Sequence, residues 1–208
     1  MILILRLKRH SRMIDEVFQI YRKHFIPAYG DFAVLAQAKP KQILIEESNV
    51  LSHLAQAFNP ELSETVHTDN YKKARNHLIR ATLDLNKLLL VELKTALDKV
   101  VLDEKKRLGF NKADHDVIRE YSEFIAKSRV AKRHEVKHVG NDPLQSIIMY
   151  EGACHLGFAL YLSLDLSKAA RVNKLLRIMT AKEFLWGLVV GLISSVIGGT
   201  VLFYFQGM

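Results

Sequence analysis

The sequence is poor in the residues that cross-link small folds or interrupt helices. Its 208 residues include one cysteine, Cys154, and four prolines. A single cysteine excludes an internal disulfide framework and fits a reducing compartment. Scarce prolines and turn dipeptides argue against an all-β fold, and no glycine-rich phosphate loop is present. These absences leave an all-α protein with one medium-sized domain as the main candidate.

Acidic residues are also in short supply. Lysine and arginine together number 30, against 22 aspartates and glutamates, so the net charge is +8. A balance of this sign favours an anionic partner, either a nucleic acid or a lipid surface.

Apolar residues recur at helical spacing along most of the chain. Helices are predicted over residues 14–25, 42–58, 70–108, 112–139 and from 142 onward. Pro27 and Gly30 are expected to end the first helix. Asp142 is expected to cap the last, with Pro143 in its first turn and a break near 165–167. Long helices of this kind pack as an antiparallel bundle.

A run of 22 residues without a charge, 184–205, lies near the C-terminus. At 1.5 Å per residue it matches the roughly 30 Å of a bilayer core. Trp186 and Tyr204 lie near its ends, where amphipathic rings prefer the interface. The sequence therefore predicts an all-α protein with a cytoplasmic bundle over 1–182 and a C-terminal transmembrane anchor over 183–208.

Basic residues precede this run, and no charged residue follows it. They are Lys168, Arg171, Lys174, Arg177 and Lys182. By the positive-inside rule the long N-terminal part is cytoplasmic, so a single-pass protein of the bacterial inner membrane is predicted. The same cations are expected to face the anionic headgroups of a lipid membrane.

Small residues recur at every fourth position inside the run. They are Gly187, Gly191, Ser195 and Gly199. This spacing places them on one helix face, where a neighbouring backbone can approach closely. A homo-oligomer is therefore predicted, and a pore would require a ring of subunits.

The segment from His134 to His138 spells H-E-x-x-H, in which two histidines on one helix face bind zinc. Glu151 or His155 could supply a third ligand. Three cations, Lys132, Arg133 and Lys137, crowd the motif and oppose a divalent metal. Zinc at His134 and His138 is therefore only an alternative, and no cofactor is predicted.

The same helix carries Arg129-x4-His134, the spacing of the nuclease motif of HEPN domains. The arginine could stabilise charge on a scissile phosphate, and the histidine could act as acid or base. In those small helical bundles two chains usually complete the site. The residue after the arginine is Val130, where HEPN nucleases tend to have a polar residue. The alternative interpretation is a solvated basic face.

Three further stretches carry a resemblance. The segments Tyr71–Lys87, Ala131–Glu135 and Tyr150–Ala153 are similar to helices of HEPN-like proteins in prokaryotic antiphage defence. The layout also resembles the membrane-bound accessory subunits of type VI CRISPR systems. That resemblance implies a ring-shaped membrane pore and a defence-system protein as a partner.

The charged residues Arg80 and Asp84 allow two interpretations. They are predicted to meet across a subunit contact, whereas the alternative is pairing of Asp84 with Arg80 or Lys87 within the helix.

A basic patch also allows two interpretations: it either binds RNA phosphates or only keeps the domain soluble. This patch consists of Lys127, Lys132, Arg133 and Lys137.

The leading hypothesis is a self-associating, tail-anchored defence effector or accessory that forms a pore or disrupts the membrane. A membrane-tethered HEPN-type ribonuclease that uses Arg129 and His134 is the alternative enzyme, with a zinc protease behind it. A non-enzymatic membrane adaptor is the third hypothesis, and the balance leans away from an enzyme.

Overall fold

The computed structural model describes the backbone of residues 2–206 and the side chains of 11–175, 177–191 and 194. The elements are α1 (Ile2–Ile20), the π-helical turn η1 (Tyr21–Phe25), α2 (Ile26–Ala36), α3 (Lys41–Ala57), α4 (Glu64–Val101), α5 (Glu104–Arg107), α6 (Asp114–Lys137), α7 (Pro143–Leu162) and α8 (Leu166–Gln206). The described residues contain no strand, and one isolated bridge joins Phe110 to Leu164. The all-α prediction is confirmed.

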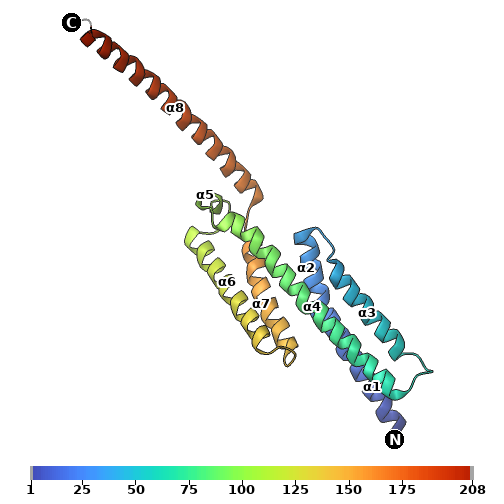
Figure 1. The fold of residues 1–208 in the computed structure, drawn as a ribbon. Coiled ribbons are helices and arrows are strands. Elements are labelled where there is room, and N and C mark those ends of the chain that lie inside the picture. The colour runs from blue at the N-terminus through green and yellow to red at the C-terminus, as the bar shows by residue number, and fades with distance from the viewer. Residues whose placement is uncertain (1, 207–208) are drawn as a thin grey trace.

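Helix α4 is the centre of the bundle (Figure 1). It contacts α1, η1, α2 and α3 along one part of its length and α5, α6 and α7 along the other. Helices α6 and α7 form an antiparallel hairpin beside it. One 38-residue helix is therefore shared by two groups of neighbours.

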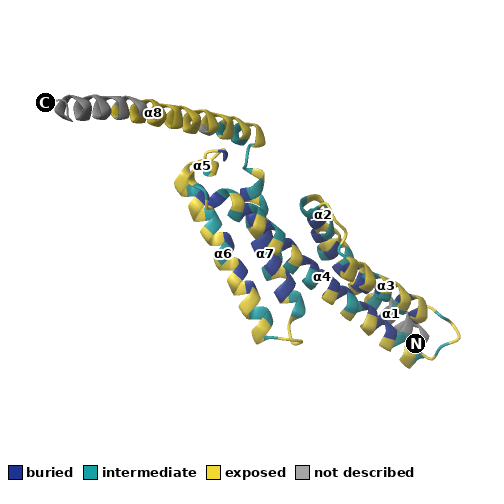
Figure 2. Ribbon diagram, turned by 45° about the horizontal axis from the view of Figure 1, so that its top comes forward, coloured by how far each residue is buried: buried dark blue, intermediate teal, exposed yellow. Residues whose placement is uncertain are grey.

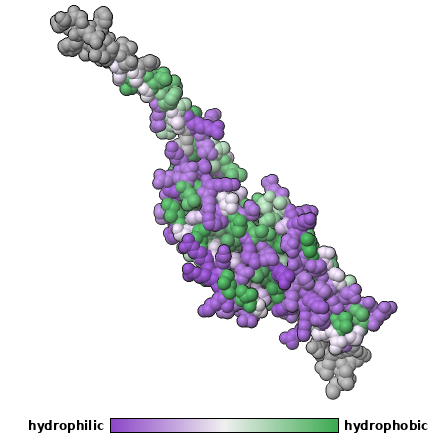
Figure 3. All heavy atoms as spheres, in the orientation of Figure 1, coloured by the Kyte–Doolittle hydropathy of each residue, from purple (hydrophilic) through white to green (hydrophobic). Residues whose placement is uncertain are grey.

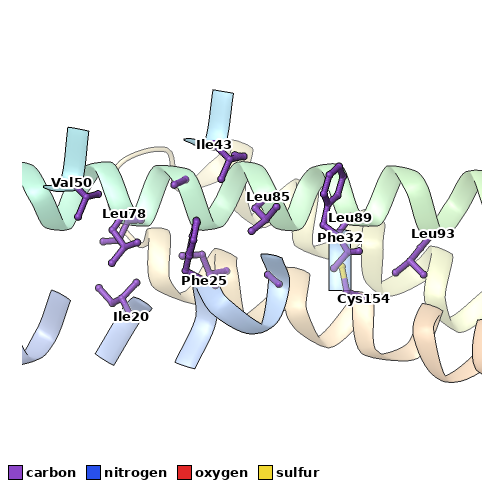
Figure 4. Close-up of a cluster of buried hydrophobic side chains, with 14 of the residues drawn as sticks. Ile20, Phe25, Phe32, Ile43, Val50, Leu78, Leu85, Leu89, Leu93 and Cys154 are labelled. Atoms are coloured by element: carbon purple, nitrogen blue, oxygen red, sulfur yellow. The ribbon is translucent and has the colours of Figure 1, made fainter. Parts of the chain in front are cut away.

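The core follows the leucines of α4 (Figure 4). Five of them follow one another at intervals of four or seven residues and are at most 1% exposed. They are Leu78, Leu85, Leu89, Leu93 and Leu97. Ile20, Phe25 and Phe32 approach from the N-terminal helices, and Cys154 approaches from α7. Burial of each large apolar side chain contributes about 1.5–3 kcal/mol, so this row stabilises the whole bundle.

The N-terminal helices continue past Pro27 and Gly30, where the sequence predicts an end. Proline has no N–H, and its ring clashes with the carbonyl four residues earlier in a regular helix. Here the turn before it widens to a π-turn, and the N–H of Ile26 donates to Tyr21 O. Pro27 then occupies the first turn of α2, a position that tolerates it.

Several other helix boundaries can be compared with those predicted from the sequence. The prediction over 42–58 is confirmed by α3, and the break near 165–167 lies where α8 begins. The predicted helix over 70–108 is instead α4 and the short α5. Asp103 separates them, because its side chain accepts from the backbone N–H groups of Lys105 and Lys106.

The start of α8 is tied to the bundle. Lys168 Nζ donates to the carbonyl of Phe110 over 2.6 Å. The N–H of Asp165 donates to Gly109 O over 3.0 Å. Beyond this junction the helix leads away from the bundle, and its described side chains are exposed from Asn173 onward (Figure 2).

The sequence predicts a transmembrane helix over 184–205, and the structure contradicts it. Among the described residues, no helix is both long enough and apolar enough to cross a membrane. Helix α8 has 41 residues, but its first part carries five cations between Lys168 and Lys182, and charge is costly in hydrocarbon. Side chains 192–193 and 195–206 lie outside the described residues. The predictions of a transmembrane anchor and of a single-pass inner-membrane protein are therefore wrong.

The packing of α7 predicts opposite effects at two glycines. A Cβ at Gly157 would lie 2.8 Å from Phe124 Cε2, whereas a Cβ at Gly152 meets nothing within 4 Å. Because Phe124 is fully buried, Gly157→Ala should lower the free energy of unfolding by about 1–3 kcal/mol. Gly152→Ala should raise it by up to about 1 kcal/mol, since alanine is the better helix former. Urea unfolding of both variants checks this, and equal effects would contradict the packing.

Candidate functional site

The H-E-x-x-H segment lies at the C-terminal end of α6, against α7. The His134 Nδ1 lies 3.1 Å from Ser146 Oγ, and His138 Nδ1 donates to the backbone carbonyl of His134. The two rings stack with centroids 4.4 Å apart. Both histidines thus take part in local contacts that fix the end of the helix.

Glu135 turns into the bundle, where two helices supply donors to its carboxylate. Lys87 Nζ on α4 donates to Oε1 over 3.0 Å, and the Tyr150 hydroxyl on α7 donates to Oε2 over 2.7 Å. Burial raises the pKa of Glu135, but these hydrogen bonds outweigh burial and hold the pKa below its ordinary value. Lys87 also pairs with Asp84 at 2.7 Å.

These contacts prevent Glu135 and Glu151 from taking the roles that they would have in a zinc protease. Its glutamate would have to face a water between the two histidines, whereas Glu135 is bound to Lys87 and Tyr150. Glu151 pairs instead with His24, with 2.8 Å between Oε1 and Nδ1. No group of three metal-binding side chains occurs in the part of the chain that the structure describes.

The nuclease pair is not assembled within one chain. Residues five apart on a helix lie about 140° apart around its axis. Arg129 is accordingly exposed, while His134 is half-buried beside Ser146. A site that uses both would need a second chain, so the HEPN-type nuclease stays a prediction.

Arg80 and Asp84, which were predicted to meet across a subunit contact, both have ion-pair partners within the chain. Asp84 pairs with Lys87, which was the alternative, and Arg80 Nη1 lies 3.7 Å from Glu46 Oε1. His77 Nδ1 lies 2.6 Å from the other oxygen of Glu46. Neither observation tests a contact between chains, but both side chains have partners within the chain.

Glu46 is a buried residue that sequence reasoning missed. Its side chain is 7% exposed and lies between α3 and α4. The signal was present, because Glu46 interrupts an apolar row that contains Ile43, Val50 and Leu54 at helical spacing. An acid in such a row predicts an internal partner, which is His77.

A small cleft of about 70 Å³ lies between the N-terminal helices and α7. Its lining includes Asp31, Glu151, Cys154 and His155. Burial raises the pKa of Asp31. Burial also raises the pKa of the Cys154 thiol to about 12, and the acids Asp31 and Glu151 add to this shift. The thiol is therefore protonated at neutral pH, and its side chain packs as a small residue of the core.

The functional residues predicted on α8 divide into two sets. Of the cations, Lys168 binds the Phe110 carbonyl, and the others are exposed. Of the small residues, Gly187 and Gly191 have nothing within 4 Å of an added Cβ. The side chains at 195 and 199 lie outside the described residues.

The Glu135 network predicts a stability loss that depends on pH. Tyr150→Phe removes a hydrogen bond to a charged group and should lower the free energy of unfolding by about 1–2 kcal/mol at pH 7. Because the pKa of Glu135 is lower in the folded protein than in the unfolded chain, its carboxylate stabilises the fold at pH values above the unfolded pKa of about 4.3. This contribution is lost as the pH falls through the folded pKa. The loss in the variant should therefore shrink between pH 5 and pH 3, measured by urea unfolding.

Tyr161→Phe on the same helix is the matched control, because its hydroxyl makes no hydrogen bond to any of the described residues. An equal loss in both variants, or a loss independent of pH, would remove Tyr150 from the network.

Comparison with protein-family models, curated proteins and solved structures gives no significant match to this chain. The resemblance to HEPN-like defence proteins therefore rests on the sequence stretches alone and stays a prediction.

Proposed function

We propose that this protein is a non-enzymatic helical adaptor that assembles with a second copy of itself through α8. The observation that carries the proposal is the exposed apolar surface of this helix, which the bundle leaves uncovered. The pore-forming role predicted from the sequence requires a membrane-spanning helix, and no helix among the described residues is long and apolar enough to be one. The proposal retains self-association and the adaptor hypothesis.

The exposed apolar side chains follow one another closely along α8. Between Phe184 and Val190, each apolar side chain is 42–71% exposed. Figure 3 shows hydrophobic atoms gathered on α8 next to the grey end. Contiguous apolar patches of this kind usually mark an interaction site. Each such side chain that a partner covers would add on the order of 1 kcal/mol to association.

The glycines of α8 support a close approach by another helix. Glycine inside a helix costs about 1 kcal/mol relative to alanine. The fold does not require this cost, because an added Cβ at Gly187 or Gly191 meets nothing within 4 Å. Small residues four apart let a second backbone come near, so a partner helix explains both positions.

A second copy is the occupant that this surface fits best. The sequence from 184 to 206 contains no charged residue, so two copies do not repel each other there. Each copy also presents the same small and apolar residues. A two-fold contact between identical patches is the commonest arrangement in homo-oligomers.

The polar groups of the bundle support an adaptor over an enzyme. Glu135, Glu46 and Glu151 are each bound to a cationic or imidazole partner. Cys154 is held as a thiol, and Arg129 and His134 do not converge within the chain. These groups stabilise helix contacts, and none of them pairs a nucleophile with a base.

Oligomeric mass tests the proposal. The wild-type full chain should have at least twice the monomer mass by light scattering coupled to size exclusion. The double variant Gly187→Leu and Gly191→Leu should be monomeric, because two leucines hold the helices apart. Gly30→Leu is the matched control, since it adds leucine at another open helical glycine, and it should assemble like the wild type. A monomeric wild type, or an assembled double variant, would contradict the proposal.

A further inference from the structure

The outer surface of α6 carries an unbalanced positive charge. Five of the residues from 127 to 137 are cationic, and all five are exposed. They are Lys127, Arg129, Lys132, Arg133 and Lys137. Among the described residues, no carboxylate lies within 4 Å of any of them, although Arg75, Arg107 and Lys112 elsewhere in the bundle each have one.

The charge is unbalanced because the fold withdraws the local acid. Glu135 is the only acidic residue between 124 and 141. Its carboxylate accepts hydrogen bonds from Lys87 and Tyr150 on the inner side of α6. The negative charge of this segment is thus paired inside the bundle, and its positive charges remain on the outer surface of α6.

Four of the cations lie on one face. Arg129, Lys132, Arg133 and Lys137 are spaced three, four and eight residues from the first, which places them along one side of a helix. The set spans about 12 Å along the axis. We call these four residues the basic face. It includes Arg129 and excludes His134, whose ring lies against Ser146.

We propose that the basic face binds the phosphate backbone of a nucleic-acid duplex. At about 3.4 Å of axial rise per phosphate on each strand, 12 Å covers three or four phosphates. Four arginine and lysine side chains over this length can therefore each contact one phosphate of the strand. The face therefore gives Arg129 a phosphate-binding role instead of a catalytic one.

The surroundings favour a duplex over a single strand. Single-strand binding relies on exposed aromatic rings on which bases stack. The aromatic residues of α6, Tyr121 and Phe124, are half-buried and buried. The exposed apolar residues beside the basic face, Val130 and Val136, offer no ring. Recognition of the backbone without base stacking predicts binding that is independent of sequence.

Fluorescence anisotropy with a labelled 20-base-pair duplex tests the inference. The full-length wild type should bind DNA and RNA duplexes, and both more tightly than either single strand. The slope of log K against log salt should be roughly −3 to −4 for four phosphate contacts. Arg129→Glu with Arg133→Glu should weaken binding at least ~10-fold and reduce the slope by about 2.

A charge-matched variant distinguishes the contribution of the basic face from the general effect of a lower net charge. Lys39→Glu with Lys41→Glu changes the charge equally at two exposed residues on another part of the surface, and it should weaken binding less than ~3-fold. Circular dichroism should show that both variants are folded. If the glutamate variant unfolds, Arg133→Gln with Lys137→Gln should reduce the slope by about 2 instead.

Three outcomes would overturn the inference. The first is equal weakening by the two charge-matched variants, and the second is tighter binding of a single strand than of the duplex. The third is cleavage of the RNA that is lost with Arg129→Ala, which would make this residue catalytic. The inference does not depend on assembly, because a monomeric Gly187→Leu and Gly191→Leu variant keeps the basic face and should still bind one duplex.

Discussion

The burial of α4 is the constraint on which the remaining structure depends. A helix with five leucines that are at most 1% exposed along 20 residues cannot be covered by one neighbour. The N-terminal helices cover one part and the α6–α7 hairpin covers the other. Because both groups pack on the same rigid element, α4 fixes the distance between them. The polar network around Lys87, the cleft near Cys154 and the orientation of α6 all follow from this shared helix.

The same packing divides the charges of the protein into two classes. Carboxylates such as Glu46 and Glu135 face inward and meet donors from a neighbouring helix. Many cations have no equivalent internal position, since long flexible side chains keep their charged ends in water. The surplus of positive charge is therefore a surface property, and its distribution is set by where the acids are buried.

Much of the helical pattern could be predicted from the sequence, because apolar spacing and caps are local signals. The α3 boundaries, the Asp142–Pro143 start of α7 and the break before α8 illustrate this. The partner of Glu135 could not be predicted, since Lys87 is 48 residues away and their meeting depends on tertiary packing. The transmembrane prediction treated the cations before the uncharged run as the flank of a span, whereas they lie within the same helix, α8, as the run itself.

The π-turn at Tyr21–Phe25 shows how the N-terminal helices keep contact with the core. The buried residues are three or four apart on either side of the turn, as in Val17 and Ile20 or Ala28 and Phe32. Across the turn, Ile20 and Phe25 are five apart. A regular helix would rotate one of these positions towards solvent, so the wide turn absorbs a single surplus residue. The N-terminal helices thereby keep one buried face toward α4 on both sides of a turn that is one residue longer than a regular helical turn.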